Sequence, residues 1–216
     1  MNESLAHRMF LLSYDVDKGK LDAASVLVRG SLLRAAAVVE LVQRGLLRES
    51  GGKVERAPAA AFPPDDAFLA DVLGAVREHR PRRWTTLIDT GFQHAEAAVR
   101  DQLAAAGVIT AERRRALGLF PVHDITAADP GRVRELQGRV RDVVLGGRPP
   151  AAHEPDDVVL AAFALEGDVR TAFTGKERRA HKDAAKAAAA HVDERLPHVR
   201  KALTLSIAAR RSAATA

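Results

Sequence analysis

The chain has 216 residues, of which 47% are hydrophobic, and its formal net charge is +5. This length and hydrophobic content suffice for one large domain with a substantial core, and the absence of cysteine excludes disulfides, thiolate metal sites and a cysteine nucleophile. The excess of basic residues favours acidic partners, either nucleic-acid phosphates or anionic lipid head groups, without choosing between them.

The N-terminal residues 1–15 contain a short apolar run, Met9–Leu12, which is too short for the core of a signal peptide. No stretch approaches the roughly 20 apolar residues of a membrane span. We therefore expect a cytoplasmic protein, whose contact with a membrane would be peripheral, on the inner face of the cell membrane. Residues 5–14 are predicted to form a short helix and residues 15–20 a turn.

The stretch from Ser31 to Gly45 is predicted to be the central helix of the fold. Its apolar residues cover nearly the whole circumference at helical spacing, so the helix needs neighbours on all sides. Gly45 is expected to end it with a positive φ. Arg34 and Glu40 interrupt the apolar surface. Arg34 is either snorkelling or ion-paired, or it projects into an anion-binding pocket, and both interpretations stay open.

Residues 46–56 form two short segments around Ser-Gly-Gly, which predicts a β-hairpin. Residues 65–79 show amphipathic periodicity, and Pro81 is expected to end that helix. Trp84 is predicted to anchor the core rather than to stack on a ligand. The basic junction before it consists of Arg80, Arg82 and Arg83.

A second helix that ends at a glycine, residues 94–106 followed by Gly107, precedes a second predicted hairpin, Val108–Val122. The basic residues of its predicted tip are Arg113, Arg114 and Arg115. The apolar residues of its outer strand are Leu117, Leu119 and Phe120. An apolar edge beside a basic tip suits docking on another subunit or contact with an anionic interface. The alternative is that these apolar residues cover the protein's own core.

The last part of the chain is predicted to be helical. A helix over residues 129–145 has a basic face formed by Arg132, Arg134, Arg139 and Arg141. Three prolines make residues 148–157 a predicted linker. The helices expected after it are residues 158–173, 176–196 and 199–210. The fold class is therefore mainly α: one helical-bundle domain over residues 1–216, around a buried central helix, with two short β-hairpins.

No pattern of catalytic residues is recognisable. The eight histidines lack metal-ligand spacing, and neither phosphate-binding glycine loops nor nucleophile motifs occur. Pairs such as His191 with Glu194 are interpreted as solvated surface charges. We therefore expect no enzyme, no catalytic or metal-binding residue and no cofactor.

The central helix also carries a resemblance. Leu33-Arg34, Glu40-Leu41 and Arg44-Gly45 resemble the Leu-Arg…Glu-Leu-x-x-Arg-Gly helix of the Golgi phosphoprotein 3 family, whose members also occur in actinobacteria. Further segments similar to the family follow in the same order. They are Phe62–Leu73, Arg80–Arg82, Gly107–Ile109, Leu117–Pro121 and Asp129–Gly146.

The resemblance implies a mostly helical single domain with a buried central helix and a hairpin used in self-association. The family's eukaryotic members are peripheral membrane adaptors that bind phosphatidylinositol 4-phosphate and recruit glycosyltransferases. Arg34 matches the arginine of the family's lipid pocket. The tryptophan of that pocket falls at about Ser25, and its two later arginines fall near Gln93 and Glu96.

We therefore predict a non-enzymatic protein that binds anionic lipid or phosphate head groups and that is a candidate homo-oligomer through its second hairpin. The candidate anion-binding residues are Arg29, Arg34, Arg82 and Arg83. One alternative is a winged-helix-like regulator that binds nucleic acid, and another is a protein-interaction scaffold without lipid binding. Nucleic acid is the less favoured partner, because the helix before each hairpin is apolar or mixed rather than basic.

Overall fold

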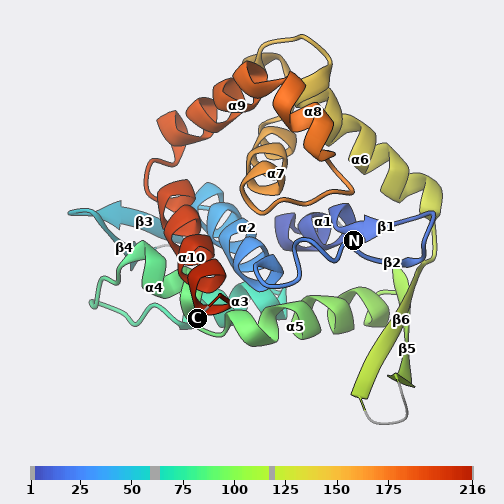
Figure 1. Cartoon of the computed structure of the whole chain (residues 1–216). Coiled ribbons are helices and arrows are strands. Elements are labelled where there is room, and N and C mark those ends of the chain that lie inside the picture. Colours follow the sequence, from blue (N-terminus) through green and yellow to red (C-terminus); the bar gives the residue numbers. More distant parts are fainter. Residues whose placement is uncertain (1–2, 59–63, 117–119, 216) are drawn as a thin grey trace.

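The computed structural model describes residues 3–58, 64–116 and 120–215 (Figure 1). Its helices are α1 (Leu5–Leu12), α2 (Arg29–Gln43), α3 (Ala67–Gly74), α4 (Trp84–Asp89), α5 (Phe92–Ala105), α6 (Pro130–Leu145), α7 (Pro155–Glu166), α8 (Gly175–Ala180), α9 (Lys182–Arg195) and α10 (Val199–Ala213), with a short 3₁₀ helix η2 (Pro150–Ala152) before α7. Its strands are β1 (Tyr14–Asp15), β2 (Lys20–Leu21), β3 (Leu47–Ser50), β4 (Lys53–Arg56), β5 (Ile109–Ala116) and β6 (Phe120–Ala127). Within the described ranges the strands form three antiparallel pairs, β1-β2, β3-β4 and β5-β6. The fold is mainly α, as predicted, and the turn expected after α1 holds an additional strand pair.

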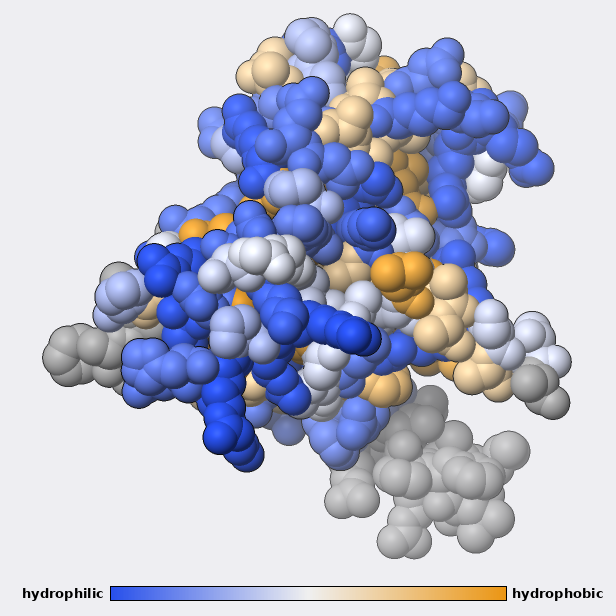
Figure 2. Space-filling model, turned by 90° about the vertical axis from the view of Figure 1, so that its left-hand side faces the viewer, coloured by the Kyte–Doolittle hydropathy of each residue, from blue (hydrophilic) through white to orange (hydrophobic). Residues whose placement is uncertain are grey.

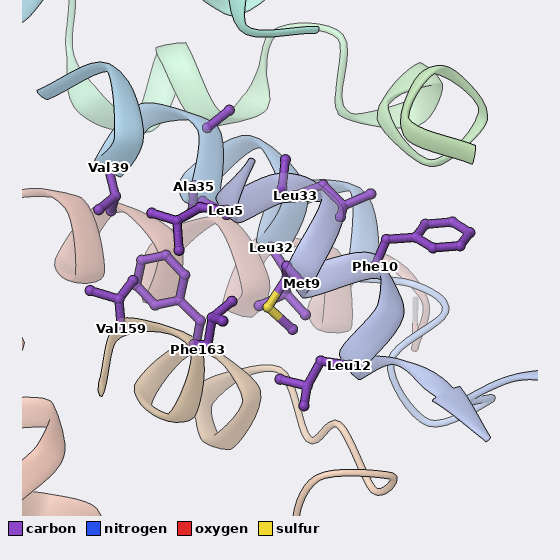
Figure 3. Packing of buried hydrophobic residues seen from close by; sticks show 14 of the residues in the cluster. Leu5, Met9, Phe10, Leu12, Leu32, Leu33, Ala35, Val39, Val159 and Phe163 are labelled. Carbon is purple, nitrogen blue, oxygen red and sulfur yellow. The ribbon is translucent and has the colours of Figure 1, made fainter. Parts of the chain in front are cut away.

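Helix α2 lies at the centre of the fold, as the sequence predicts. It contacts α1, α3, α4, α5, α7, α10 and strand β3, and all its residues from Arg29 to Leu41 are buried. Figure 3 shows Leu32, Leu33 and Ala35 of α2 packed among side chains of α1 and α7. Since burial of apolar surface contributes roughly 25 cal/mol per Å², the helices around α2 are held mainly by covering it.

The first turn of α2 approaches α5 very closely at Gly30. A Cβ atom added to Gly30 would lie 2.1 Å from the backbone carbonyl oxygen of Phe92. A backbone oxygen cannot turn aside as the end of a flexible side chain can. The distance between α2 and α5 therefore depends on glycine at this position.

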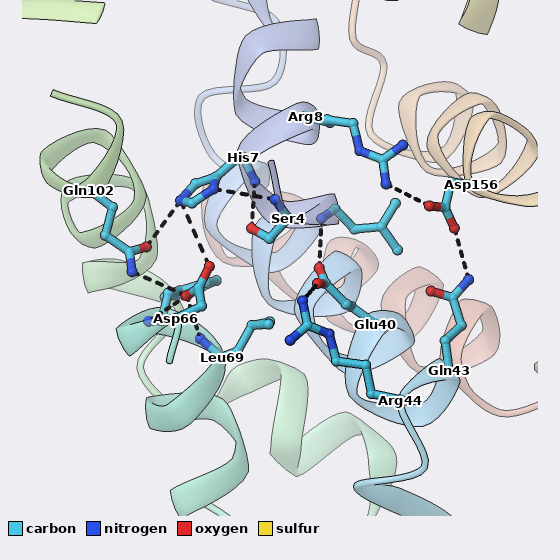
Figure 4. A network of polar contacts seen from close by, with 12 residues as sticks. Ser4, His7, Arg8, Glu40, Gln43, Arg44, Asp66, Leu69, Gln102 and Asp156 are labelled. Carbon is cyan, nitrogen blue, oxygen red and sulfur yellow. Dashed lines mark hydrogen bonds and ion pairs between the residues drawn. The ribbon is translucent and has the colours of Figure 1, made fainter. Parts of the chain in front are cut away.

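Polar contacts fix the ends of the helices around α2 (Figure 4). The carboxylate of Glu40 accepts a hydrogen bond from the backbone N–H of Leu5 at 2.7 Å and also pairs with Arg44. Asp66 caps the N-terminus of α3, and the side-chain amide of Gln102 from α5 donates to it at 3.1 Å. Because the first N–H groups of a helix have no partner within the helix, these carboxylates stabilise α1 and α3 where they begin.

Both predicted hairpins are present, and each follows a helix that ends at a glycine in the left-handed region. Gly45 has φ 68° and Gly107 has φ 69°. In the first hairpin, Leu47 and Val54 point into the core and are buried. Val54 also exchanges two backbone hydrogen bonds of 2.8 Å with Arg82, which ties the hairpin to the segment before α4.

The second hairpin is longer than predicted and extends away from the helices (Figure 1). At its base, Ile109 pairs with Ala127, and both are buried. Arg113, Arg114 and Arg115 belong to strand β5, so the prediction that they form a loop was wrong. Antiparallel pairing continues to Ala116 opposite Phe120. Two predicted apolar residues, Leu117 and Leu119, lie outside the described residues.

The segment between the first hairpin and α5 differs from the prediction. Helix α3 ends at Gly74 rather than at residue 79, because glycine is a poor helix former and His79 is left-handed with φ 56°. Pro81 therefore does not end it. The short helix α4 was not predicted. Trp84 at its start is buried, with 7% of its surface exposed, as expected of a core residue.

The helices after the predicted linker also have different boundaries. Helix α7 begins at Pro155, inside residues 148–157, because proline is well tolerated in the first turn of a helix. It ends at Glu166, and Asp168 follows with φ 57°. The predicted helix over residues 176–196 is divided into α8 and α9 at His181, which has φ −112° and ψ 36°.

The apolar residues buried by these elements form a hydrophobic cluster to which α1, α2, α5, α6, α7 and α10 all contribute. In the described ranges, none of the helices combines the length and hydrophobicity that crossing a bilayer requires.

Candidate anion-binding site

Arg34 lies in the middle of α2, with 1% of its surface exposed. Its Nε donates to the carbonyl oxygen of Leu87 at 3.2 Å, and its Nη1 donates to the carboxylate of Asp71 at 3.1 Å. Of the interpretations that the sequence leaves open, the structure therefore shows an ion pair. Whether Arg34 also serves an anion stays a prediction.

The guanidinium of Arg34 is not fully satisfied by these contacts. Its Nη2 is buried and has no hydrogen-bond partner among the described residues. Burial lowers the pKa of Arg34, Asp71 opposes this effect, and the positive charge of Arg82 adds to it. A buried cation with a free donor is costly. An anion close to Arg34 and Arg82 would satisfy that donor and reduce the repulsion between the two side chains.

Arg82 stands at the edge of a surface pocket with a volume of about 410 Å³. The pocket is lined by Gly74, Ala75, Arg77, Arg80, Pro81 and Arg82. Nη1 of Arg82 donates to the carbonyl oxygen of Ala75 at 2.5 Å, which fixes its side chain against the end of α3. Among the residues that the structure describes, the lining thus holds three guanidinium groups and no carboxylate, an arrangement that favours anions with several oxygens. We call it the arginine pocket.

The local sequence explains why these arginines gather. Helix α3 stops at Gly74, and α4 does not begin until Trp84. The connection between them leaves Arg77 and Arg80 exposed. Arg83 follows as the N-cap of α4 and is exposed as well, but it does not line the arginine pocket.

Arg29 is not part of the arginine pocket. With 3% of its surface exposed, it donates from Nη1 to the carboxylate of Glu96 at 2.8 Å. Its Nη2 donates to the carbonyl oxygen of Asp22 and to the hydroxyl of Ser25. Its charge is neutralised inside the protein, and it fastens the loop before α2 to α5. Of the four predicted residues, Arg29 and Arg34 therefore form separate ion pairs, Arg82 lines the arginine pocket, and Arg83 is exposed without lining it.

Besides Arg34, two positions that the family resemblance assigns to a lipid pocket contact Arg29. Ser25 accepts one of its hydrogen bonds, and Glu96 carries a negative charge where an arginine is implied. Gln93 is exposed on α5, about one helical turn before Glu96. An anion at this place would have to compete with Glu96 for Arg29, so these residues do not favour one.

The basic face predicted for α6 is occupied by ion pairs. Its four arginines pair as Arg132–Glu3, Arg134–Asp17, Arg139–Asp157 and Arg141–Glu177. These contacts fasten α6 to the N-terminal segment, to α7 and to α8. They leave α6 with little free positive charge for a partner.

Sequence reasoning missed two residues of the site. Arg77 lies in the segment that was predicted to be helical up to residue 79, where a charged residue is normally interpreted as part of the solvated face. Asp71 invites the same interpretation, because its partner Arg34 is 37 residues away in the sequence. The run of basic residues around Pro81 was the available signal for the arginine pocket.

Comparison with known proteins agrees with the resemblance seen in the sequence. The family model described as Golgi phosphoprotein 3 (GPP34) matches residues 5–205. A search of the curated proteins finds no match to the chain. The matched range begins with α1 and includes the arginine pocket and part of α10.

Proposed function

Because the chain belongs to the Golgi phosphoprotein 3 family, we propose that it is a non-enzymatic, cytoplasmic adaptor that binds the phosphate-bearing head groups of anionic lipids. The binding site in this proposal is the arginine pocket, and the membrane would be the inner face of the cell membrane. Arg34 supports the site from inside the core. It contacts α3 at Asp71, and Arg82 contacts α3 about one turn later, at Ala75.

The observation that carries this proposal is the set of three arginines around a pocket whose described lining residues include no carboxylate. Each basic residue near an anionic bilayer contributes about 1 kcal/mol. Three of them support weak, reversible binding that falls steeply with salt. A pocket of about 410 Å³ is near the lower end of the usual range for small-molecule sites, which suits a head group.

Nucleic acid is the less supported partner. A winged helix places an exposed recognition helix in a DNA groove. Helix α2, which precedes the first hairpin, is buried from Arg29 to Leu41. Helix α5, which precedes the second, exposes Gln93, His94 and Asp101 rather than a basic face.

Flotation of the full chain with vesicles tests the proposal. Vesicles of phosphatidylcholine alone are compared with vesicles that also contain phosphatidylserine or a phosphatidylinositol phosphate, at low and at high salt. The charge reversals Arg77→Glu and Arg80→Glu should lower retention on the anionic vesicles. Arg195→Glu, which reverses an exposed charge on α9, is the matched control and should not.

Two results would refute it: retention that is unchanged by salt, or equal loss in the pocket variants and the control. A measurement with inorganic phosphate distinguishes a lipid head group from soluble phosphate as the ligand. If it raises the melting temperature of the wild type but not of Arg80→Glu, while anionic vesicles do not retain the protein, the pocket binds soluble phosphate instead of a membrane.

A further inference from the structure

A second basic surface lies between the C-terminal helices. Helices α7, α8, α9 and α10 border an open groove of about 830 Å³, which shares no lining residue with the arginine pocket. In Figure 1, α7, α8 and α9 form the upper part of the molecule and α10 lies below them. We call this feature the C-terminal groove.

The C-terminal groove carries a large excess of positive charge. Its basic lining residues are Arg170, Arg178, Arg179, Lys182, Lys186 and Arg211. In the part of the chain that the structure describes, Glu166 is the one acidic lining residue, and it already accepts a hydrogen bond from Arg200 at 3.3 Å. An acidic partner would therefore meet little repulsion here.

Some of these cations are already paired and others are not. Asp168 holds Arg170 and Arg178, and Lys186 lies 4.0 Å from Asp183. The remaining three make no ion pair within the described ranges; they are Arg179, Lys182 and Arg211. They come from α8, α9 and α10, so free positive charge borders the groove on three helices.

The apolar lining residues, which we call the floor of the groove, are mostly alanines. Ala185 and Ala189 of α9 lie one turn apart, and α7 contributes Ala162 and Leu165. In an α-helix, residues three and four apart share a face, so α9 presents its alanines beside Lys182 and Lys186. In the upper part of the face shown in Figure 2, hydrophobic residues in tan and orange lie between hydrophilic ones in blue. Short side chains leave room for larger apolar groups of a partner.

We propose that the C-terminal groove docks an acidic amphipathic helix of a partner protein. The partner's apolar face would lie on the alanine floor, and its carboxylates would meet Arg179, Lys182 and Arg211. Helix-in-groove recognition uses this combination of an apolar stripe and complementary charge. Such a site would give an adaptor a protein-binding surface separate from its membrane-binding one.

The shape and chemistry of the groove argue against other occupants. A concave surface offers a flat bilayer few contacts on its floor. A free phosphate would use the cations but not the apolar floor. Single-stranded nucleic acid is bound with aromatic side chains on which its bases stack, and the groove lining contains none.

Binding of a synthetic peptide to the full chain tests the proposal. The probe is a fluorescent amphipathic helix with leucine on one face and glutamate on the other, and its control is a scrambled peptide of the same composition. We expect the amphipathic peptide to bind about tenfold more tightly than the scrambled one, with an affinity that falls as salt rises. The double reversal Lys182→Glu/Arg211→Glu should weaken binding at least tenfold, whereas Arg195→Glu on the same helix α9 should leave it unchanged.

A third variant, Ala189→Phe, fills the floor without changing charge and should also weaken binding. Equal binding of both peptides, no binding of either, or full binding to Ala189→Phe would overturn the proposal. It would also be overturned if the double reversal released anionic vesicles while leaving peptide binding intact, since the surface would then face a membrane. Arg80→Glu should retain the peptide, so failure of the arginine pocket and failure of the groove are distinguishable.

Discussion

Arg34 and Asp71 form an ion pair between a buried and an exposed side chain: 1% of the Arg34 side chain and 69% of the Asp71 side chain are exposed. The two partners therefore differ in what their removal leaves behind. Without Asp71, a buried guanidinium loses its compensating charge. Without Arg34, a mostly solvated carboxylate remains.

We predict that Asp71→Ala, which removes the acceptor of Arg34, destabilises the protein by about 1.5–3 kcal/mol, the usual contribution of a hydrogen bond to a charged group. Arg34→Met should cost less, because the apolar side chain suits the core and the Asp71 carboxylate that it leaves unpaired is already 69% exposed. Urea unfolding of both variants measures this order. Arg34→Met should also reduce retention on anionic vesicles. A strongly destabilised Arg34→Met that still floats would instead make Arg34 a purely structural residue.

Two glycines offer a matched comparison inside helices. Gly30→Ala places a Cβ 2.1 Å from the Phe92 carbonyl oxygen and should cost about 3 kcal/mol or more, since the backbones of α2 and α5 must separate. Gly138→Ala on exposed α6 meets nothing within 4 Å and should stabilise by about 0.5–1 kcal/mol. Thermal unfolding followed by circular dichroism compares them. Equal shifts would mean that α2 and α5 are not as close as described.

Glu40 is expected to stabilise the start of α1. Glu40→Ala leaves the N–H of Leu5 without its acceptor and should destabilise by about 1–3 kcal/mol. Glu40→Gln keeps an acceptor oxygen and should cost less, although it weakens the pair with Arg44. Denaturant unfolding at fixed salt checks this order, and a larger loss in Glu40→Gln would point to the charge rather than the hydrogen bond.

Acid should remove the contribution that Glu177 makes to the stability of the folded protein. Hydrogen bonds from Arg141, and further ones from Thr174, lower its pKa from 4.5 to about 2. A lowered folded-state pKa means that the stabilisation is complete above about pH 4.5 and disappears as the pH falls to about 2. The melting temperature of wild type should exceed that of Glu177→Gln at neutral pH, and the difference should vanish across this window. A difference that is constant down to pH 2 would contradict the assignment.

The second hairpin is predicted to serve self-association or membrane contact, and its register allows a clean deletion. Removing residues 114–122 and joining Arg113 to His123 with Gly-Gly leaves a two-residue turn between paired positions. The buried base at Ile109 and Ile125 stays in place. The helical circular-dichroism signal should persist, while oligomer size or vesicle retention falls. If light scattering and flotation both match the wild type, the hairpin has neither role.

The central helix and both hairpins could be predicted because their signals are local. The apolar surface from Leu32 to Val42 has no alternative to burial, and Gly45 and Gly107 mark the turns that follow. The break at His181 could not be predicted, because no proline or glycine interrupts the sequence there. Helix α4 is too short for periodicity to reveal it.

The site was predictable only in part, for a related reason. The basic run around Pro81 pointed to the arginine pocket directly. The burial of Arg29 depends on Glu96, 67 residues away, and no local pattern shows such a partner. An arginine with a distant carboxylate therefore looks the same in sequence as one that is free to bind a ligand.

The placement of α10 against α2 has a consequence during synthesis. The hydroxyl groups of Ser206 and Ser31 are hydrogen-bonded at 3.1 Å across 175 residues of sequence. A ribosome that adds about 5–20 residues per second needs roughly 9–35 s to make the chain between them. Throughout that time the surface of α2 that α10 will cover stays uncovered. We therefore expect a chain that ends before α10 to expose this surface and to aggregate.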